Sequence, residues 1–296
     1  MRFVRPPAVA VVTGASTGIG RATTFALAAA GFSTFGTIRT NNDADGLVSD
    51  ATAEGLIVRP IIADVRDSES VRTAFANVVE AAGQVDVLVN NAGVGATGVV
   101  ELTPPSQYAH TFDVNCIGAV RWIQAVLPGM RERRRGCIVN VTSASGRVAS
   151  AWQSPYVASK WALEGLSECL ALEAAPFDVR VVVIEPGVTL TAAFDKRASR
   201  ILGTGGPYAP SLARLGRYVS AGLAQPTAPA VVGQVVCDAV TAQKFRFRHP
   251  CSWSGVELTR SRARTSDEAW IALAAIDDDD EYARAYEQLT GVDLSS

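Results

Sequence analysis

The chain has 296 residues, of which 48% are hydrophobic and 19% charged, and its formal net charge is −2. This composition supplies a buried core and is unlike that of a disordered chain. A nearly neutral chain lacks the basic surface that holds a phosphate backbone, so we expect no nucleic-acid partner. No apolar run is long enough for a membrane span, and the first residues lack the features of a signal peptide, so we expect a cytoplasmic protein without a membrane partner.

Metal and disulfide chemistry is not indicated. The five cysteines are scattered and form no C-x-x-C pair, which argues against a zinc site or a disulfide framework. The two histidines, His110 and His249, are isolated, and we expect structural or surface roles for them. We therefore predict no metal cofactor.

Short apolar runs alternate with helical patterns along the chain. The expected strands are residues 8–13, 33–38, 57–63, 85–90, 137–142, 179–184 and 245–250, and the expected helices are residues 18–30, 67–82, 106–134, 155–175 and 229–242. Most strand runs are continuously apolar, which is typical of parallel strands buried on both faces. We predict an α/β fold, a Rossmann-type doubly wound parallel sheet of seven strands flanked by helices.

Two regions lie outside this alternation. Residues 188–227 are rich in Gly, Ala, Ser and Pro, and we expect them to form a long substrate loop. Residues 252–296 are expected to form a C-terminal helical extension, with one helix beginning at Ser266. No linker or repeat is visible, so we predict a single dinucleotide-binding oxidoreductase domain over residues 1–296, with its core at 8–250.

A glycine-rich turn, Thr13 to Gly20 (TGASTGIG), follows the first expected strand and begins the first expected helix. Glycines let the backbone approach a pyrophosphate, and the helix N-terminus offers N–H groups to it. The G-x-x-x-G-x-G spacing differs from the usual Rossmann fingerprint, so an ordinary glycine turn remains open on this motif alone.

A second motif places Tyr156 and Lys160 four residues apart in an expected helix, on one face. A nearby ammonium favours the phenolate, which suits tyrosine to general acid–base work. A surface pair at this spacing is the alternative reading when the motif is taken alone.

Together these motifs resemble the short-chain dehydrogenase/reductase family over about residues 8–250. Further matches follow in the family's order: Asp64-Val65 after the third strand, Asn90-Asn91-Ala92-Gly93 after the fourth, Asn115 in the next helix, Ser143 thirteen residues before Tyr156, and Pro186-Gly187 with Thr191 after the sixth.

The resemblance implies a catalytic set of Asn115, Ser143, Tyr156 and Lys160. Tyr156 is then the general acid or base, Lys160 binds the nicotinamide ribose and lowers the tyrosine pKa, Ser143 holds the substrate oxygen, and Asn115 anchors a water of the proton relay. The implied cofactor-binding residues are Gly14, Ser16, Thr17, Gly18, Ile19, Gly20, Arg39, Asp64, Val65, Asn91, Ala92, Gly93, Tyr156, Lys160, Pro186, Gly187 and Thr191.

Arg39 ends the second expected strand, where a basic residue accommodates the 2′-phosphate of NADP(H) and an acid selects NAD(H). We therefore expect NADP(H). Thr17 stands where the family has another basic position, and Asp43 and Asp45 follow shortly, so NAD(H) stays open.

The expected substrate is a hydrophobic alcohol, ketone or aldehyde, by analogy with retinol and hydroxysteroid dehydrogenases of the family. Its pocket is expected to lie among residues 94–99, 145–152 and 188–227, with Trp152, Phe194, Ile201, Leu202 and Tyr208 as apolar lining. The alternatives are a non-catalytic NAD(P)-binding sensor and an epimerase built on the same site. We also expect a homodimer or homotetramer through helices 106–134 and 155–175, with Trp161, Leu166 and Leu170 on the second of these helices.

Overall fold

The computed structural model describes residues 3–191 and 206–294, and its strands form one parallel sheet in the order β3-β2-β1-β4-β5-β6-β7. This confirms the predicted doubly wound sheet. The chain order reverses between β1 and β4, which opens a crevice at the carboxyl ends of these strands. The strands are β1 (Val9–Val12), β2 (Ser33–Ile38), β3 (Val58–Ile62), β4 (Val87–Asn90), β5 (Gly136–Val141), β6 (Val179–Pro186) and β7 (Arg248–Cys251).

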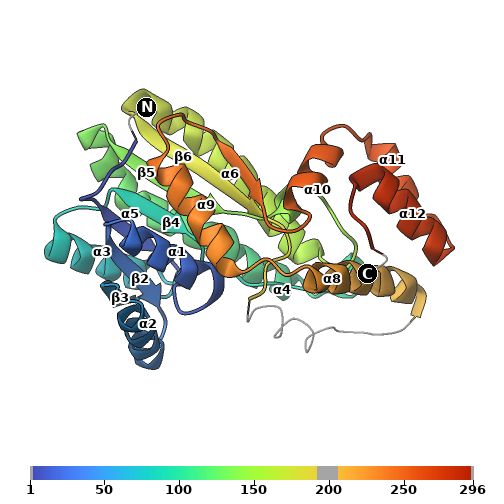
Figure 1. The fold of residues 1–296 in the computed structure, drawn as a ribbon, viewed down its shortest axis with the longest axis horizontal. Coiled ribbons are helices and arrows are strands. Elements are labelled where there is room, and N and C mark those ends of the chain that lie inside the picture. Colours follow the sequence, from blue (N-terminus) through green and yellow to red (C-terminus); the bar gives the residue numbers. More distant parts are fainter. Residues whose placement is uncertain (1–2, 192–205, 295–296) are drawn as a thin grey trace.

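Helices cover both faces of the sheet (Figure 1). On β1, Val9 and Val11 belong to one apolar cluster, and Ala10 and Val12 to another, because alternate side chains point to opposite faces. The first cluster is completed by α3 (Ser68–Ala82), α5 (Gly118–Arg133) and α6 (Ser154–Ala174). The second is completed by α1 (Gly18–Ala29) and α9 (Pro229–Thr241).

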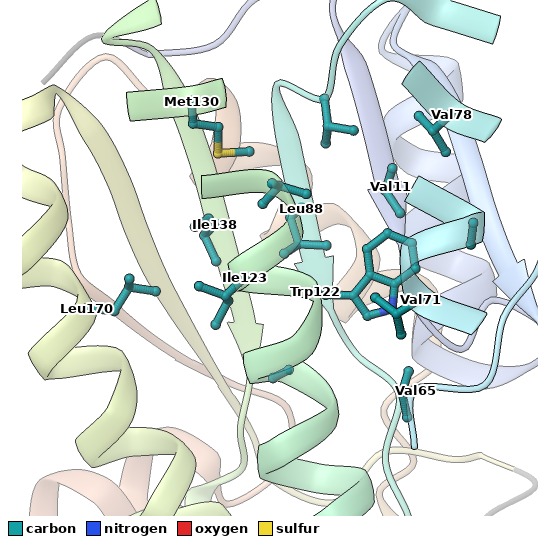
Figure 2. Close-up of a cluster of buried hydrophobic side chains, with 14 of the residues drawn as sticks. Val11, Val65, Val71, Val78, Leu88, Trp122, Ile123, Met130, Ile138 and Leu170 are labelled. Atoms are coloured by element: carbon teal, nitrogen blue, oxygen red, sulfur yellow. The ribbon is translucent and has the colours of Figure 1, made fainter. Parts of the chain in front are cut away.

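The centre of the first cluster lies between α5 and the middle of the sheet. Figure 2 shows Trp122, Ile123 and Met130 of α5 beside Leu88 of β4 and Ile138 of β5. All five side chains are buried. Burial of a large side chain contributes about 1.5–3 kcal/mol, so this contact fixes α5 and the turn that precedes it.

The C-terminal helices form a separate unit at one end of the molecule, beside α8 (Ala209–Ala224) (Figure 1). They are α10 (Gly255–Arg262), α11 (Asp267–Leu273) and α12 (Asp279–Thr290). Their own apolar cluster includes Leu258, Leu273 and Tyr286. The predicted helix start at Ser266 is confirmed, because its side chain accepts a hydrogen bond from Ala269 N at 3.2 Å. Among the helices within the described residues, none combines the length and apolarity that crossing a membrane requires.

Four details differ from the sequence predictions. A helix not predicted, α2 (Asn41–Ala53), packs beside β3, and the expected helix 106–134 is α4 (Pro105–Phe112), a π-helical turn (Asp113–Ile117) and α5 in succession. The expected loop 188–227 contains α8, and the seventh strand begins at Arg248 rather than at residue 245. Helix α2 buries only Leu47 and Ala51, so its local apolar pattern is weak.

Candidate active site

A cavity of about 830 Å³ lies at the carboxyl edge of the sheet, where the topology opens the crevice. Every residue expected to bind the cofactor lines it, and so do three of the four expected catalytic residues. The expected residues on its wall are Gly14, Ser16, Thr17, Gly18, Ile19, Gly20, Arg39, Asp64, Val65, Asn91, Ala92, Gly93, Ser143, Tyr156, Lys160, Pro186, Gly187 and Thr191. Tertiary structure thus gathers positions spread over more than half of the chain.

Two glycines of the glycine-rich turn, Gly14 and Gly20, leave no room for a side chain. Gly14 has φ +68°, and a Cβ added at Gly20 would lie 2.2 Å from the Gly14 carbonyl oxygen. Asn91 braces the turn, since its Nδ2 donates to Thr13 O at 2.9 Å and to Gly14 O at 3.3 Å. The turn is therefore held by the residue that follows β4, which couples the two sides of the crevice.

The N-terminus of α1 faces the same cavity through Thr17, Gly18 and Ile19. Thr17 is extended and its side chain caps no backbone N–H, and the first turn carries no acidic residue. The N–H groups and the positive end of the helix dipole remain available to an anion. This arrangement fits a pyrophosphate.

Two arginines also line the cavity. Arg39 is exposed at the end of β2, and Arg66 donates to both carboxylate oxygens of Asp64, with Nη2 2.6 Å from Oδ2. The Arg66 hydrogen bonds hold the pKa of Asp64 at about 2, with a smaller contribution from the charge of Arg39. Asp64 is thus anionic and already paired, and Arg39 makes no hydrogen bond or ion pair with other described residues. The sequence analysis did not single out Arg66, although its place beside Asp64 was a usable signal.

Ser143, Tyr156 and Lys160 meet where the cavity reaches β5 and α6. Lys160 is buried, and its Nζ donates to Val141 O at 2.9 Å. The same Nζ lies 5.8 Å from the centre of the Tyr156 ring. Ser143 Oγ donates to Pro186 O at 3.3 Å and accepts from Ser145 N at 3.1 Å. The helix spacing and the ends of β5 and β6 therefore bring a phenol, an ammonium and a hydroxyl to one place.

Asn115 lies behind this group and not on the cavity wall. Its Oδ1 accepts from Val94 N at 2.7 Å, and its Nδ2 donates to Val94 O at 3.0 Å and to Ser159 Oγ at 2.9 Å. It sits in the π-helical turn, where Gly118 N bonds to Asp113 O, five residues back. Such turns are frequent at functional sites. Asn115 therefore links the loop that follows β4 to α6.

The expected apolar lining is partly wrong. Trp152 is buried, but it lines neither this cavity nor the smaller cavity that adjoins it. Its Nε1 donates instead to Tyr208 O at 3.1 Å and to Ser211 Oγ at 2.9 Å. Tyr208 donates its hydroxyl to Glu101 at 2.6 Å and is also absent from both walls. Phe194, Ile201 and Leu202 lie outside the described residues. His110 lines the larger cavity, a position its isolation in the sequence did not indicate.

A second, mainly apolar cavity of about 220 Å³ adjoins the first. The two share Ser143, Tyr156 and Gly187. A molecule in the second cavity thus reaches the same phenol and hydroxyl as one in the first.

Comparison with known proteins places this geometry in a family. The family model described as short chain dehydrogenase matches residues 8–201. A 3-ketodihydrosphingosine reductase of Bacteroides thetaiotaomicron is 35% identical over 243 residues, covering 82% of this chain and 87% of that protein. The 17-beta-hydroxysteroid dehydrogenase type 1 of Mus musculus is 38% identical over 196 residues, covering 64% of this chain and 56% of that protein.

Solved structures agree. A short-chain dehydrogenase from Streptomyces avermitilis has a TM-score of 0.77 and 33% identity, covering 92% of this chain and 96% of its own. A metagenomic short-chain oxidoreductase in complex with NADP has a TM-score of 0.66 and 28% identity, covering 82% of this chain and 96% of its own. The chain belongs to the short-chain dehydrogenase family.

Proposed function

We propose that this protein is an NADP(H)-dependent oxidoreductase that interconverts a hydrophobic alcohol with its ketone or aldehyde, with Tyr156 as general acid and base. The observation that carries the proposal is the meeting of Ser143, Tyr156 and Lys160 where the large cavity joins the smaller apolar one. One cavity suits a dinucleotide and the other a substrate, and the phenol lies on both walls.

The residues present fit the dinucleotide. Gly18 and Gly20 at the N-terminus of α1 would hold its pyrophosphate, and Asp64 would lie by its adenine. Arg39, exposed and without a partner among the described residues, would bind the 2′-phosphate of NADP(H). The related metagenomic enzyme, solved with NADP, supports this choice over NAD(H). When bound, the nicotinamide supplies or accepts the hydride.

Tyr156 would move the proton. In reduction its hydroxyl donates to the carbonyl oxygen, and in oxidation its phenolate takes the proton of the alcohol. The charge of Lys160, held against β5 by Val141 O at 2.9 Å, stabilises the phenolate. Ser143 would donate a hydrogen bond to the substrate oxygen and so align it with Tyr156. Asn115 would hold the chain around Val94 and Ser159 and anchor a water behind Lys160.

The substrate class is supported by the second cavity and by the names of two relatives. A 3-ketodihydrosphingosine reductase and a 17-beta-hydroxysteroid dehydrogenase are both named for largely apolar molecules. The cavity beside Tyr156 has a mainly apolar wall, which includes Val148, Val188 and Leu215. Apolar walls with few polar groups are typical of pockets for small organic ligands.

We further propose that residues 1–296 act as one domain and assemble as a homodimer or homotetramer through α4, α5 and α6. Trp161 supports this, because it is 47% exposed on α6. Leu166 and Leu170, expected beside it, pack instead against the core, and Leu170 is buried.

The experiment is NADPH oxidation, followed by absorbance, with a panel of hydrophobic ketones and with NADH in parallel. Tyr156→Phe should lower kcat by at least about a hundredfold while the affinity for NADPH is kept. Tyr208→Phe is the matched control, because this hydroxyl binds Glu101 outside both cavities. Cofactor binding without turnover of any ketone, or of any alcohol in the reverse direction, would instead favour the sensor. Isomer exchange without net change of cofactor would favour the epimerase.

A further inference from the structure

One side of the smaller cavity is formed by α8, α11 and α12, which lie in the part of the chain that the family model does not match. The other side of the cavity is formed by the β5–α6 connection, with Ser143, and by Tyr156 of α6. Tyr218 lies on α8, and Leu273 and Tyr286 lie on α11 and α12. The family match ends at residue 201. The C-terminal segment (residues 252–294) therefore contributes to the space beside Tyr156 from outside the residues that the family model matches.

Arg214 of α8 binds the C-terminal segment and holds it beside the cavity. Its side chain is 8% exposed, its Nε lies 2.9 Å from Asp279 Oδ1, and its Nη2 donates to Ile276 O at 2.6 Å. The guanidinium also lies 4.3 Å from the centre of the Tyr282 ring. One side chain thus binds the connection between α11 and α12 and the start of α12, through a carbonyl, a charge pair and an aromatic face.

A second set of contacts closes the other side. Trp270 Nε1 donates to Ala149 O at 3.2 Å, directly on the connection between β5 and α6. Val148 of the same connection is buried in the apolar cluster of the C-terminal segment. The C-terminal segment therefore contacts the connection between β5 and α6, so the position of the segment affects the shape of the cavity.

The described residues of the wall offer no unpaired charge. Among the described lining residues Arg214 is the only one charged at neutral pH, and it is paired with Asp279. Burial raises the pKa of Tyr218 to about 12 and that of Tyr286 well above its usual value, so both phenols stay neutral. A charged substituent entering here would lose water without gaining a counter-charge from any described lining residue, which is strongly unfavourable.

We propose that the C-terminal segment, fastened by Arg214, forms a selective wall that admits an uncharged aryl or alkyl group on the reacting carbonyl and rejects charged ones. This rests on the proposed oxidoreductase function and adds its specificity. Arg214 is a positioning residue in this scheme, because its charge is used by Asp279 and it acts through the wall.

The test compares two ketones of similar size and branching, para-isopropylacetophenone and para-acetylbenzoate, with butanone as a ketone too small to need the wall. The wild type should prefer the neutral aryl ketone by about a hundredfold or more in kcat/KM, since an ion buried without a partner is strongly disfavoured. Arg214→Ala should raise KM for that ketone about tenfold and erase most of the preference, with butanone turnover and NADPH affinity kept.

Arg217→Ala is the matched control, because Arg217 also contacts α12, through Asp279 O and Asp280, but lies at the surface. It should behave as the wild type. If Arg214→Ala does not fold, Leu273→Asn and Leu273→Asp answer the same question, because they share a shape and differ in charge. The Asp variant should then lose the neutral aryl ketone much more than the Asn variant.

Equal use of the two aryl ketones by the wild type, or an Arg214→Ala defect shared by butanone, would overturn the proposal. If no ketone is turned over at all, the proposed function fails separately. Calorimetric binding of the two aryl ketones to the NADP⁺-saturated protein then still decides the wall's selectivity. Preference for the neutral compound would support it, and equal affinity would refute it.

Discussion

Replacing Glu185 with glutamine should stabilise the protein above neutral pH, and the surroundings of this side chain set the size of the effect. Glu185 is 2% exposed at the end of β6, and its Oε1 has no hydrogen-bond partner among the described residues. Arg147 and Arg248 approach it only to 3.9 Å. Glu164 is nearby and is already bonded to Thr142 at 2.6 Å.

Burial, and then the charge of Glu164, raise the pKa of Glu185 from its ordinary 4.5 to about 7, despite the nearby arginines. The folded protein therefore binds this proton more tightly than the unfolded chain does. The stabilisation is complete below pH 4.5 and is lost as the pH rises to about 7. The gap between these two pKa values corresponds to about 3 kcal/mol of unfolding free energy. Glutamine keeps the neutral form at every pH and avoids this loss.

The assay is urea unfolding of wild type and Glu185→Gln at intervals from pH 5 to pH 8. The variant's advantage should grow across this range towards about 3 kcal/mol and then level off. Glu168→Gln is the control, because Glu168 pairs with the same Arg248 but is exposed, so its effect should stay within about 1 kcal/mol. An advantage that does not change with pH would refute the reasoning.

Three further outcomes follow from the site. Arg39→Asp should raise KM for NADPH by about a hundredfold and leave KM for NADH nearly unchanged, because only the 2′-phosphate needs the cation. Steady-state kinetics with both cofactors would measure this, and equal increases in KM for the two cofactors would argue against the assignment. Gly20→Ala should abolish dinucleotide binding in a titration, because its Cβ would lie 2.2 Å from Gly14 O, and normal affinity would contradict the tight turn. Trp161→Glu should shift the mass measured by light scattering towards the monomer, because the exposed indole supports an interface on α6, and an unchanged mass would remove that interface.

The succession of strands and helices and the residues that line the larger cavity could be predicted from the sequence, because both depend on short-range patterns. Strands buried on both faces are continuously apolar, so β1, β4, β5 and β6 were predicted within two residues of their observed ends. The glycine turn and the spacing of Tyr156 and Lys160 are also local, so the topology had only to bring the carboxyl ends of the strands together.

Weak local patterns hid two helices. Helix α2 is mostly polar and buries only Leu47 and Ala51, so its periodicity is faint. Thr40 accepts a hydrogen bond from Asp43 N at 3.2 Å, a helix-start signal that the sequence did contain. Helix α8 begins with Pro210 in its first turn, another usable signal within the segment expected to be a loop.

By itself, then, the sequence determined the sheet and predicted the residues that line the crevice at its carboxyl edge. Only the tertiary structure decided that Trp152 anchors α8 rather than lining a pocket, that Glu185 is buried beside Glu164, and that Arg214 holds the C-terminal segment over Tyr156. The physical reason is that the first set depends on the period of apolar residues within each element. The second depends on which surfaces meet once the elements are formed, and that pairing leaves no periodic trace in the chain.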